Sequence, residues 1–256
     1  MPFLEIQKKT NYALVTIKRP EALNALNAEL ITEIGEAVKT LESDPSIRAF
    51  ILTGEGKAFV AGADIAKMKE YGEPEGNKFS ELGQTVFRKL ELSPLVSIAA
   101  INGFSLGGGL ELALACDIRY AVPSAKLGLP EVSLGLIPGF GGSQRLPRLI
   151  GVGRASELIF SGDMITAEEG YRLGIINKIF APEELIAESE KLISTIISRG
   201  PLAIKAAKSA IRQGLEATLD KGMDWEKQLF GGLFANTESK EGLGAFLEKR
   251  KPNFGG

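Results

Sequence analysis

The sequence predicts an α/β core followed by a helical C-terminal region, and two observations carry this prediction. In the first half, short apolar runs typical of β-strands alternate with segments whose apolar residues have helical spacing. Strands separated by helical crossovers are typical of βαβ units and a largely parallel sheet. After Gly139 strand signals become scarce and helical segments follow one another. We therefore expect a core over residues 1–200 and a helical region over residues 201–256.

The strands of the core are predicted from apolar runs. Residues 49–53 (AFILT) are continuously apolar and precede Gly54, as expected for a strand covered on both faces. The first helix is predicted from Leu30, Ile34 and Val38, which share one helical face, and it ends at the Asp-Pro pair of residues 44–45. The predicted strands span residues 13–17, 49–53, 96–101, 117–121 and 175–180.

Helical segments follow the core strands, and the first begins at a capping box made by Thr166 and Glu169. The helices over residues 202–233 carry apolar residues on more than one side. A helix that is apolar all round is normally covered on every side. Either the protein's own core or a partner subunit could bury the apolar faces of these helices. The predicted helices span residues 166–171, 183–198, 202–213 and 215–233.

Composition excludes several kinds of chemistry. The chain has 256 residues, enough to hide roughly 70–75% of its unfolded surface without a disulfide or a metal. It contains no His, which excludes a Ser-His-Asp triad and a His-ligated metal within one chain. Its one cysteine, Cys116, excludes an intramolecular disulfide and favours a reducing compartment. A net charge of −2 argues against nucleic acid as the main partner.

Targeting and membrane signals are not expected. Residues 1–10 carry charged side chains and no long apolar run, so the sequence does not predict a secretory signal. No segment approaches the ~18 uninterrupted apolar residues of a membrane helix. We therefore expect a cytoplasmic protein without a membrane partner.

A glycine cluster before an apolar helix is the most informative segment. Gly107, Gly108 and Gly109 follow a predicted buried strand, and Glu111 lies in the first turn of the helix. Backbone N–H groups at a helix N-terminus favour negative charge. The alternative is a tight strand-to-helix turn in which Glu111 only complements the helix dipole.

This segment does not support a nucleophile elbow or a nucleotide-binding motif. Residues 103–107 (GFSLG) match the G-x-S-x-G nucleophile elbow, but the elbow needs a His base that the chain does not contain. The glycines match neither G-x-G-x-x-G nor a Walker A motif. We therefore reject a hydrolase.

A second carboxylate, Glu131, also lies among apolar residues and glycines. Alone it fits an ordinary glutamate at a helix start after Pro130. Two carboxylates in apolar settings favour acid–base chemistry, because burial raises a carboxyl pKa towards neutrality. Paired carboxylates also suit glycosidases. Sugar sites are usually lined with aromatics, however, and the chain has a single Trp, Trp225, far along in the helical region.

A loop of small residues, 57–65 (KAFVAGADI), follows the strand at 49–53. Small side chains let a ligand approach the backbone closely, and a free N–H here could face the one at Gly108. A plain surface loop is the alternative, since glycine commonly punctuates loops.

Six segments of the sequence together resemble the motifs of a known family. They are residues 18–26 (KRPEALNAL), 59–65 (FVAGADI), 102–113 (NGFSLGGGLELA), 116–119 (CDIR), 129–142 (LPEVSLGLIPGFGG) and 241–252 (EGLGAFLEKRKP). In this order they resemble the crotonase (enoyl-CoA hydratase/isomerase) superfamily over nearly the whole chain. The resemblance implies a spiral of ββα repeats with a C-terminal helical trimerisation region, in a homotrimer or a homohexamer of two trimers.

The resemblance also implies a lyase that adds water reversibly to trans-2-enoyl-CoA, giving 3-hydroxyacyl-CoA. The thioester carbonyl would lie between the N–H groups of Ala63 and Gly108, since the shared intermediate is a thioester enolate. Glu111 and Glu131 match the two glutamates of hydratases, and the N–H of Gly139 would help to position the water. The alternatives are a Δ3,Δ2-enoyl-CoA isomerase or another acyl-CoA lyase on the same fold, and a non-catalytic acyl-CoA or RNA-binding scaffold.

Coenzyme A enters as part of the substrate, and the resemblance implies no metal and no redox cofactor. Many hydratases carry Lys directly after the Ala-Asp-Ile stretch, where this chain has Ala66 followed by Lys67. Anchoring would then rest on Lys67, Lys57 or Lys249. The residues that the resemblance assigns to coenzyme A binding are Leu26, Ala61, Ala63, Asp64, Ile65, Lys67, Phe246 and Lys249.

Overall fold

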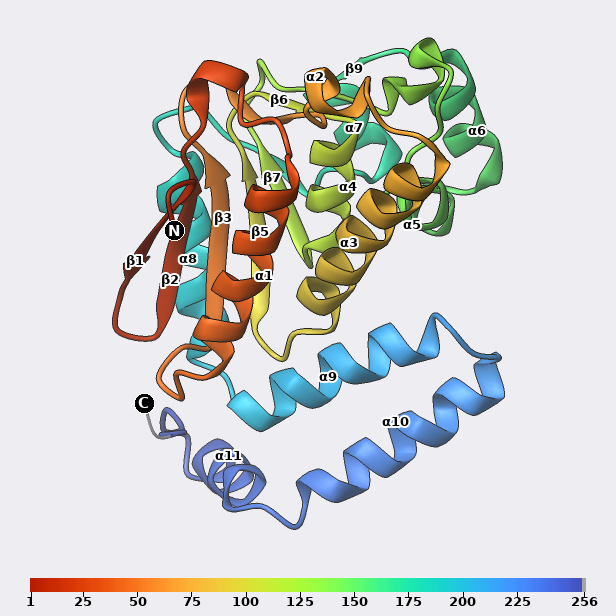
Figure 1. Cartoon of the computed structure of the whole chain (residues 1–256). Helices are drawn as coiled ribbons and strands as arrows, with labels where there is room; N and C mark the ends of the chain where they lie inside the picture. Colours follow the sequence, from red (N-terminus) through yellow and green to blue (C-terminus); the bar gives the residue numbers. More distant parts are fainter. Residues whose placement is uncertain (255–256) are drawn as a thin grey trace.

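Two β-sheets and the helices around them form the core of the computed structural model, which describes residues 1–254 (Figure 1). The larger sheet has the order β1-β2-β3-β5-β7-β10, and only the β1–β2 pair is antiparallel. Its strands are β1 (Leu4–Lys8), β2 (Tyr12–Ile17), β3 (Ala49–Gly54), β5 (Val96–Ile101), β7 (Ile118–Ala121) and β10 (Lys178–Ile179).

The smaller sheet has the order β4-β6-β8-β9, and its last strand is antiparallel to its neighbour. Its strands are β4 (Ala58–Ala61), β6 (Phe104–Leu106), β8 (Lys126–Gly128) and β9 (Ile165–Thr166). Three successive strand pairs, β3–β4, β5–β6 and β7–β8, each place one strand in each sheet, and a helix follows each pair. The expected spiral of ββα repeats is therefore confirmed.

Helices connect the strands of the two sheets and form the C-terminal part of the described chain. The α-helices are α1 (Ala28–Glu42), α2 (Ile65–Met68), α3 (Glu73–Leu92), α4 (Gly108–Ala115), α5 (Gly142–Ile150), α6 (Val152–Ser161), α7 (Ala167–Leu173), α8 (Leu185–Ile197), α9 (Pro201–Gly214), α10 (Leu219–Leu233) and α11 (Thr237–Leu247), and the 3-10 turns are η1 (Pro20–Ala22) and η2 (Pro130–Leu134). No helix within residues 1–254 is long and apolar enough to cross a membrane.

Local sequence explains the central elements. Asn27 caps α1 by accepting a hydrogen bond from the Leu30 amide at 2.8 Å, and the predicted apolar face of α1 is buried. Every residue of β3 and β5 is buried, as their continuous apolar runs predict. Strands at 13–17, 96–101 and 117–121 are likewise present within a residue of the expected bounds.

Three expectations need correction. The run at 175–180 contributes only Lys178–Ile179 to the sheet, because the Ile175 amide donates back to the Gly170 carbonyl and closes the turn after α7. The helix expected from residue 215 begins at Leu219, after a turn that ends α9. The capping box is half formed, since Thr166 accepts from the Glu169 amide while the Glu169 carboxylate bonds Arg172 instead.

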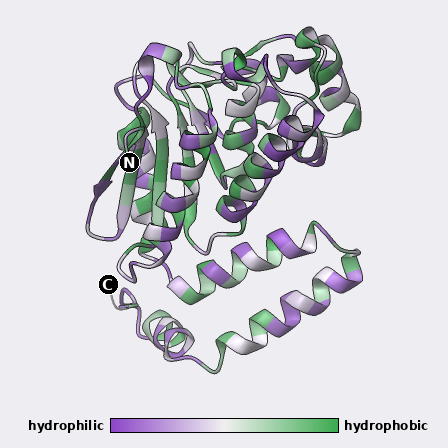
Figure 2. Ribbon diagram, viewed as in Figure 1, coloured by the Kyte–Doolittle hydropathy of each residue, from purple (hydrophilic) through white to green (hydrophobic). Residues whose placement is uncertain are grey.

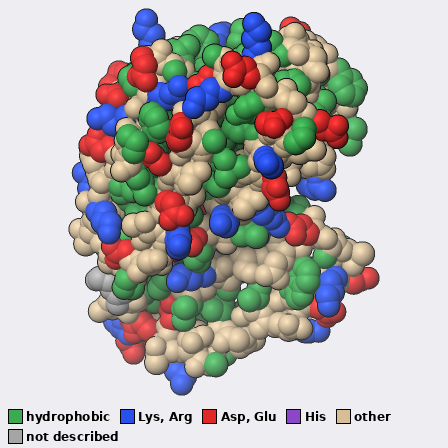
Figure 3. Space-filling model, viewed as in Figure 1, with side chains coloured by type: hydrophobic (Ala, Val, Ile, Leu, Met, Phe, Trp, Pro, Cys, Tyr) green, Lys and Arg blue, Asp and Glu red, His purple; other side chains and the backbone are tan. Residues whose placement is uncertain are grey.

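The C-terminal helices lie beside the core, and α9 is tied to it by ion pairs of Lys208 with Asp117 and of Arg212 with Glu91. Figures 1 and 2 show α9, α10 and α11 below the sheets, with apolar residues interleaved along them, and Figure 3 shows the surface indented between them and the core. Within the described residues, α9 and α10 bury no side chain and α11 buries only Ala245. The exposed large apolar residues here include Ile211, Leu215, Leu219, Phe230, Phe234, Leu243, Phe246 and Leu247. The helices α9, α10 and α11 fall within the range 201–256, of which residues 255–256 lie outside the described part.

Candidate active site

A cavity of about 1360 Å³ lies between the core and α9. Its walls come from α3, the start of α4, η2, the loop before α5, and one face of α9. Seven of the predicted site residues line it: Ala61, Ala63, Ile65, Gly108, Glu111, Glu131 and Gly139. Residues separated by up to 78 positions along the chain therefore meet in one cavity.

Two backbone amides face this cavity without a partner. Parallel pairing of β4 with β6 sets Ala61 beside Leu106, which brings the next residues of both strands together. Ala63 forms a parallel bridge with Leu26 that uses the amides of Leu26 and Asp64, so the Ala63 N–H points away from that bridge. Gly108 begins α4, where helical geometry leaves the N–H unpaired. No hydrogen bond among residues 1–254 uses either amide, so both can bind an oxyanion.

Close packing explains the glycines at this turn. Gly107 has φ +50°, a region that favours glycine. A Cβ on Gly108 would lie 2.9 Å from Leu26 Cδ1 and 3.0 Å from the Phe140 ring. The turn therefore requires small residues for both backbone conformation and space.

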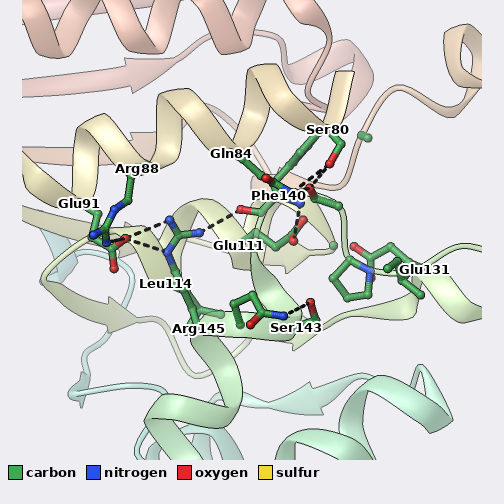
Figure 4. Close-up of a pocket in the computed structure, with 18 of the residues that line it drawn as sticks. Ser80, Gln84, Arg88, Glu91, Glu111, Leu114, Glu131, Phe140, Ser143 and Arg145 are labelled. Carbon is green, nitrogen blue, oxygen red and sulfur yellow. Dashed lines mark hydrogen bonds and ion pairs between the residues drawn. The ribbon is translucent and has the colours of Figure 1, made fainter. Parts of the chain in front are cut away.

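Glu111 projects from the first turn of α4 into the cavity and is 1% exposed (Figure 4). Its Oε1 accepts hydrogen bonds from the Phe140 amide at 2.8 Å and the Gly142 amide at 2.7 Å. The pKa of Glu111 is raised to about 7, mainly because the carboxyl is buried; a negative charge on Glu131 contributes to the rise, and the two amides oppose it. At neutral pH this carboxyl can both take and give a proton.

Glu131 lies in η2, beside the start of α4. A Cβ on Gly107 would be 2.8 Å from Glu131 Oε1, so this carboxyl sits directly against the glycine turn. Its Oε2 is buried and has no hydrogen-bond partner among the described residues. Burial raises the pKa of Glu131. A buried oxygen without a partner favours the protonated, neutral carboxyl.

Gly139 is held by its carbonyl, which leaves its amide available. The Gly139 carbonyl accepts from Ser80 Oγ at 2.6 Å and from Gln84 Nε2 at 3.0 Å, both on α3. No hydrogen bond among residues 1–254 uses the Gly139 N–H. It lies at the cavity one residue before Phe140, whose amide holds Glu111.

The residues expected to bind coenzyme A fall into two places. Ala61, Ala63 and Ile65 line the cavity, and Ile65 is 48% exposed at its mouth. Leu26 is fully buried beneath Gly108, whereas Asp64 pairs with Arg19 at 2.8 Å. Lys67 is exposed and lies 3.4 Å from Glu29. Phe246 on α11 and Lys249 just after it do not line the cavity, so within one chain the structure does not bring them to the site.

Some residues at the site were not foreseen from the sequence. Ser80 and Gln84 hold the Gly139 carbonyl, and Arg145 donates to the Phe140 carbonyl at 2.9 Å. Arg19 bonds the Ala25 carbonyl and Asp64, and so fixes the loop that carries Ala63. Of these residues only Arg145 has a local sequence signal, its position soon after the Gly141–Gly142 pair. Ser80 and Gln84 have none, because polar residues on a helix such as α3 are typical of an ordinary solvent-exposed face.

Across residues 1–254, no group of three or more His, Cys, Asp or Glu side chains is arranged to hold a metal ion. Glu111 and Glu131 are the carboxyls beside the unpaired amides, and towards α9 the cavity is lined by further charged side chains, among them Glu91, Asp117 and Arg212.

Comparison with known proteins agrees with this geometry. Residues 7–256 match the model of the enoyl-CoA hydratase/isomerase family. A crotonyl-CoA hydratase of Syntrophomonas wolfei is 48% identical over 250 residues, covering 97% of this chain and 96% of the relative. A short-chain-enoyl-CoA hydratase of Clostridium acetobutylicum is 47% identical over 247 residues, covering 96% and 95%. The crystal structure of an enoyl-CoA hydratase from Bacillus anthracis superposes with a TM-score of 0.95 at 39% identity, covering 98% of each chain.

A spiral α/β fold with two carboxyls beside a pair of free amides defines the class of crotonase-like acyl-CoA enzymes. The chain belongs to the enoyl-CoA hydratase/isomerase family. The resemblance inferred from the sequence motifs is therefore confirmed.

Proposed function

We propose that the protein is a short-chain enoyl-CoA hydratase, a lyase that adds water reversibly to trans-2-enoyl-CoA. The observation that carries this proposal is the placement of Glu111 and Glu131 at one cavity with the unpaired amides of Ala63 and Gly108. The two relatives named above, which act on crotonyl-CoA and on short-chain enoyl-CoA according to their names, support the same reaction.

The amides of Ala63 and Gly108 receive the thioester carbonyl oxygen. As the hydroxyl adds to C3, negative charge moves onto this oxygen and gives an enolate. Preorganised N–H donors stabilise that charge more than they stabilise the neutral carbonyl, so they lower the barrier. The N-terminal end of α4 adds its dipole at Gly108.

The two glutamates divide the proton transfers. Ionised Glu111, assisted by the Gly139 N–H, orients a water and takes one proton as the oxygen bonds to C3. Protonated Glu131 delivers its proton to C2, so the elements of one water are added and the two carboxyls exchange protonation states. Burial of both carboxyls supports this pairing, since it raises the pKa of each above its ordinary value, that of Glu111 to about 7.

An isomerase is the alternative, because the matching family includes isomerases by its description. Moving the double bond of a 3-enoyl-CoA to C2 requires only one proton carrier, which takes a proton from C2 and returns a proton to C4, whereas hydration uses a base for water as well. The presence of Glu111, with one oxygen fixed and the other unbonded, favours hydration. Incubation with crotonyl-CoA and with a 3-enoyl-CoA tests this: we expect 3-hydroxybutyryl-CoA from the first, and rapid double-bond migration without hydration would refute the proposal.

Coenzyme A would be held by Leu26, Ala61, Ala63, Asp64, Ile65 and Lys67 of one chain, and by Phe246 and Lys249. The last two lie away from the cavity of their own chain, and Phe246 is 80% exposed, so they would reach a site by assembly of subunits. Uncovered apolar residues on α9–α11 support residues 201–256 as the oligomerisation region of a homotrimer or homohexamer. The single buried cysteine supports a location in the cytoplasm.

A further inference from the structure

The backbone of the loop of residues 139–142 fixes the position of the Glu111 carboxylate. Two amides of this loop, from Phe140 and Gly142, bond the same carboxylate oxygen at 2.8 and 2.7 Å. Gly142 is the first residue of α5, and the Gly141 carbonyl accepts from the Gln144 and Arg145 amides. Residues 139 and 140 have no regular secondary structure, so neighbouring side chains set their geometry.

Arg145 bends back from α5 onto the middle of this loop. Its Nη1 donates to the Phe140 carbonyl at 2.9 Å, and this carbonyl lies in the peptide between the two amides that bind Glu111. Gly141 has φ +104°, and a Cβ there would overlap the guanidinium. Glycine at this position is therefore required by the backbone and also by the close approach of Arg145.

The other edge of the guanidinium is anchored on α3. Arg145 Nη2 and Nε donate to Glu91 Oε2 at 3.0 and 3.3 Å (Figure 4). Glu91 is 7% exposed and also accepts from Arg88 at 2.9 Å and from Arg212 of α9 at 3.0 Å. Three arginines thus fix one carboxylate, and a planar guanidinium bonded on two edges has little freedom to move.

We infer that Arg145 is a positioning residue for hydration: anchored by Glu91, it pins the Phe140 carbonyl and keeps the Phe140 and Gly142 amides aimed at Glu111. The inference rests on the proposed role of Glu111 as base. Arg145 makes no hydrogen bond with Glu111 and acts through the loop and through its charge. Its side chain is 15% exposed, so solvent screens that charge only in part.

The test compares three variants, Arg145→Gln, Arg145→Lys and Glu91→Gln, with Arg172→Gln as a matched control. Arg172 pairs with Glu169 on the exposed surface of α7. Crotonyl-CoA hydration by Arg145→Gln should show kcat lower by about 10- to 100-fold with KM little changed, because the base is displaced while the oxyanion amides are not. Arg145→Lys and Glu91→Gln should lose less, and the control should match the wild type.

The pH profile of kcat/KM distinguishes the electrostatic effect of Arg145 on Glu111 from its effect on the geometry of the loop. The charged groups acting on Glu111 are Glu131 of η2 and Arg145 of α5, and Arg145 in turn faces Glu91 on α3. The positive charge of Arg145 lowers the pKa of Glu111, so Arg145→Gln should raise that pKa and move the acid limb of kcat/KM to higher pH. Arg145→Lys keeps the charge and should leave the limb in place. Glu91→Gln should not move it upward.

A ¹³C NMR titration of the Glu111 carboxyl measures the same shift without turnover. It distinguishes failure of the inference from failure of the proposed function, because a wild-type protein that does not hydrate crotonyl-CoA refutes only the latter. An unchanged kcat and acid limb in Arg145→Gln would overturn the inference, as would a rise in KM alone. The inference would also be overturned if kcat fell in all three variants only in proportion to a lower Tm, and the Glu111 titration of Arg145→Gln was unshifted. If Arg145→Gln does not fold, Arg145→Lys and Glu91→Gln decide by kcat: a lower kcat at unchanged KM and Tm supports the inference, and a wild-type kcat in both, or a loss that only follows a lower Tm, overturns it.

Discussion

Replacing Glu111 with Gln should abolish most hydration and yet stabilise the folded protein at pH 8. The amide oxygen of Gln keeps the acceptor that the Phe140 and Gly142 amides use at 2.8 and 2.7 Å. The substitution therefore preserves the contacts and removes only the ionisable group. Loss of the base should lower kcat by about 10²–10⁴-fold, or raise the barrier by about 3–5 kcal/mol.

The stability effect follows from the buried charge. Folding raises the pKa of Glu111 from its ordinary 4.5 to about 7, so between these pH values the folded chain binds more protons than the unfolded chain. The free energy of unfolding therefore falls as the pH rises through this window. Above pH 7 the wild type carries the whole cost, about 3 kcal/mol, and Glu111→Gln carries none. The two proteins should converge in stability near pH 4.5.

Urea unfolding at pH 5 and pH 8 checks this prediction, at one protein concentration because the stability of an assembled chain depends on it. Glu169→Gln is the matched control, since its carboxylate is in an exposed pair with Arg172. The control should keep its activity and gain no stability at pH 8. A Glu111→Gln variant that is no more stable than the wild type at pH 8 would refute the buried-charge reasoning, and near wild-type hydration would refute the role as base.

Three further predictions concern the second carboxyl, the oxyanion site and assembly. Glu131→Gln should lower kcat by about 10²–10⁴-fold, with the Glu111 double variant losing less than the product of the singles; a near wild-type rate would remove Glu131 from the mechanism. Gly108→Pro lacks the donor and should lose about 10²–10³-fold in kcat, and Gly108→Ala tests the space beside Leu26; unaltered kinetics in both would place the thioester oxygen elsewhere. Light scattering should report a trimer or hexamer, and deletion from Leu215 should give inactive, aggregated or monomeric protein; a monodisperse, fully active monomer of the intact chain would contradict this.

The sequence by itself determined what is local. Continuous apolar runs marked β3 and β5 because strands covered on both faces have no polar side. Gly108 and Glu111 lie three residues apart on one helix, so their common side of α4 follows from helical spacing alone. The helix α3 was not predicted, since Pro74, Gly76 and Gly83 interrupt its pattern and its few buried residues mostly follow residue 82.

Only the tertiary structure decided which groups meet. Ala63 faces the same cavity as Gly108 because β4 pairs with β6, and the amides that hold Glu111 come from 29 and 31 residues further along the chain. The ion pair between Glu91 and Arg145 spans 54 residues. Every residue except proline carries the same backbone N–H, so residue type cannot mark which amides are left unpaired. That depends on strand pairing and loop closure, which are set by packing across the whole chain.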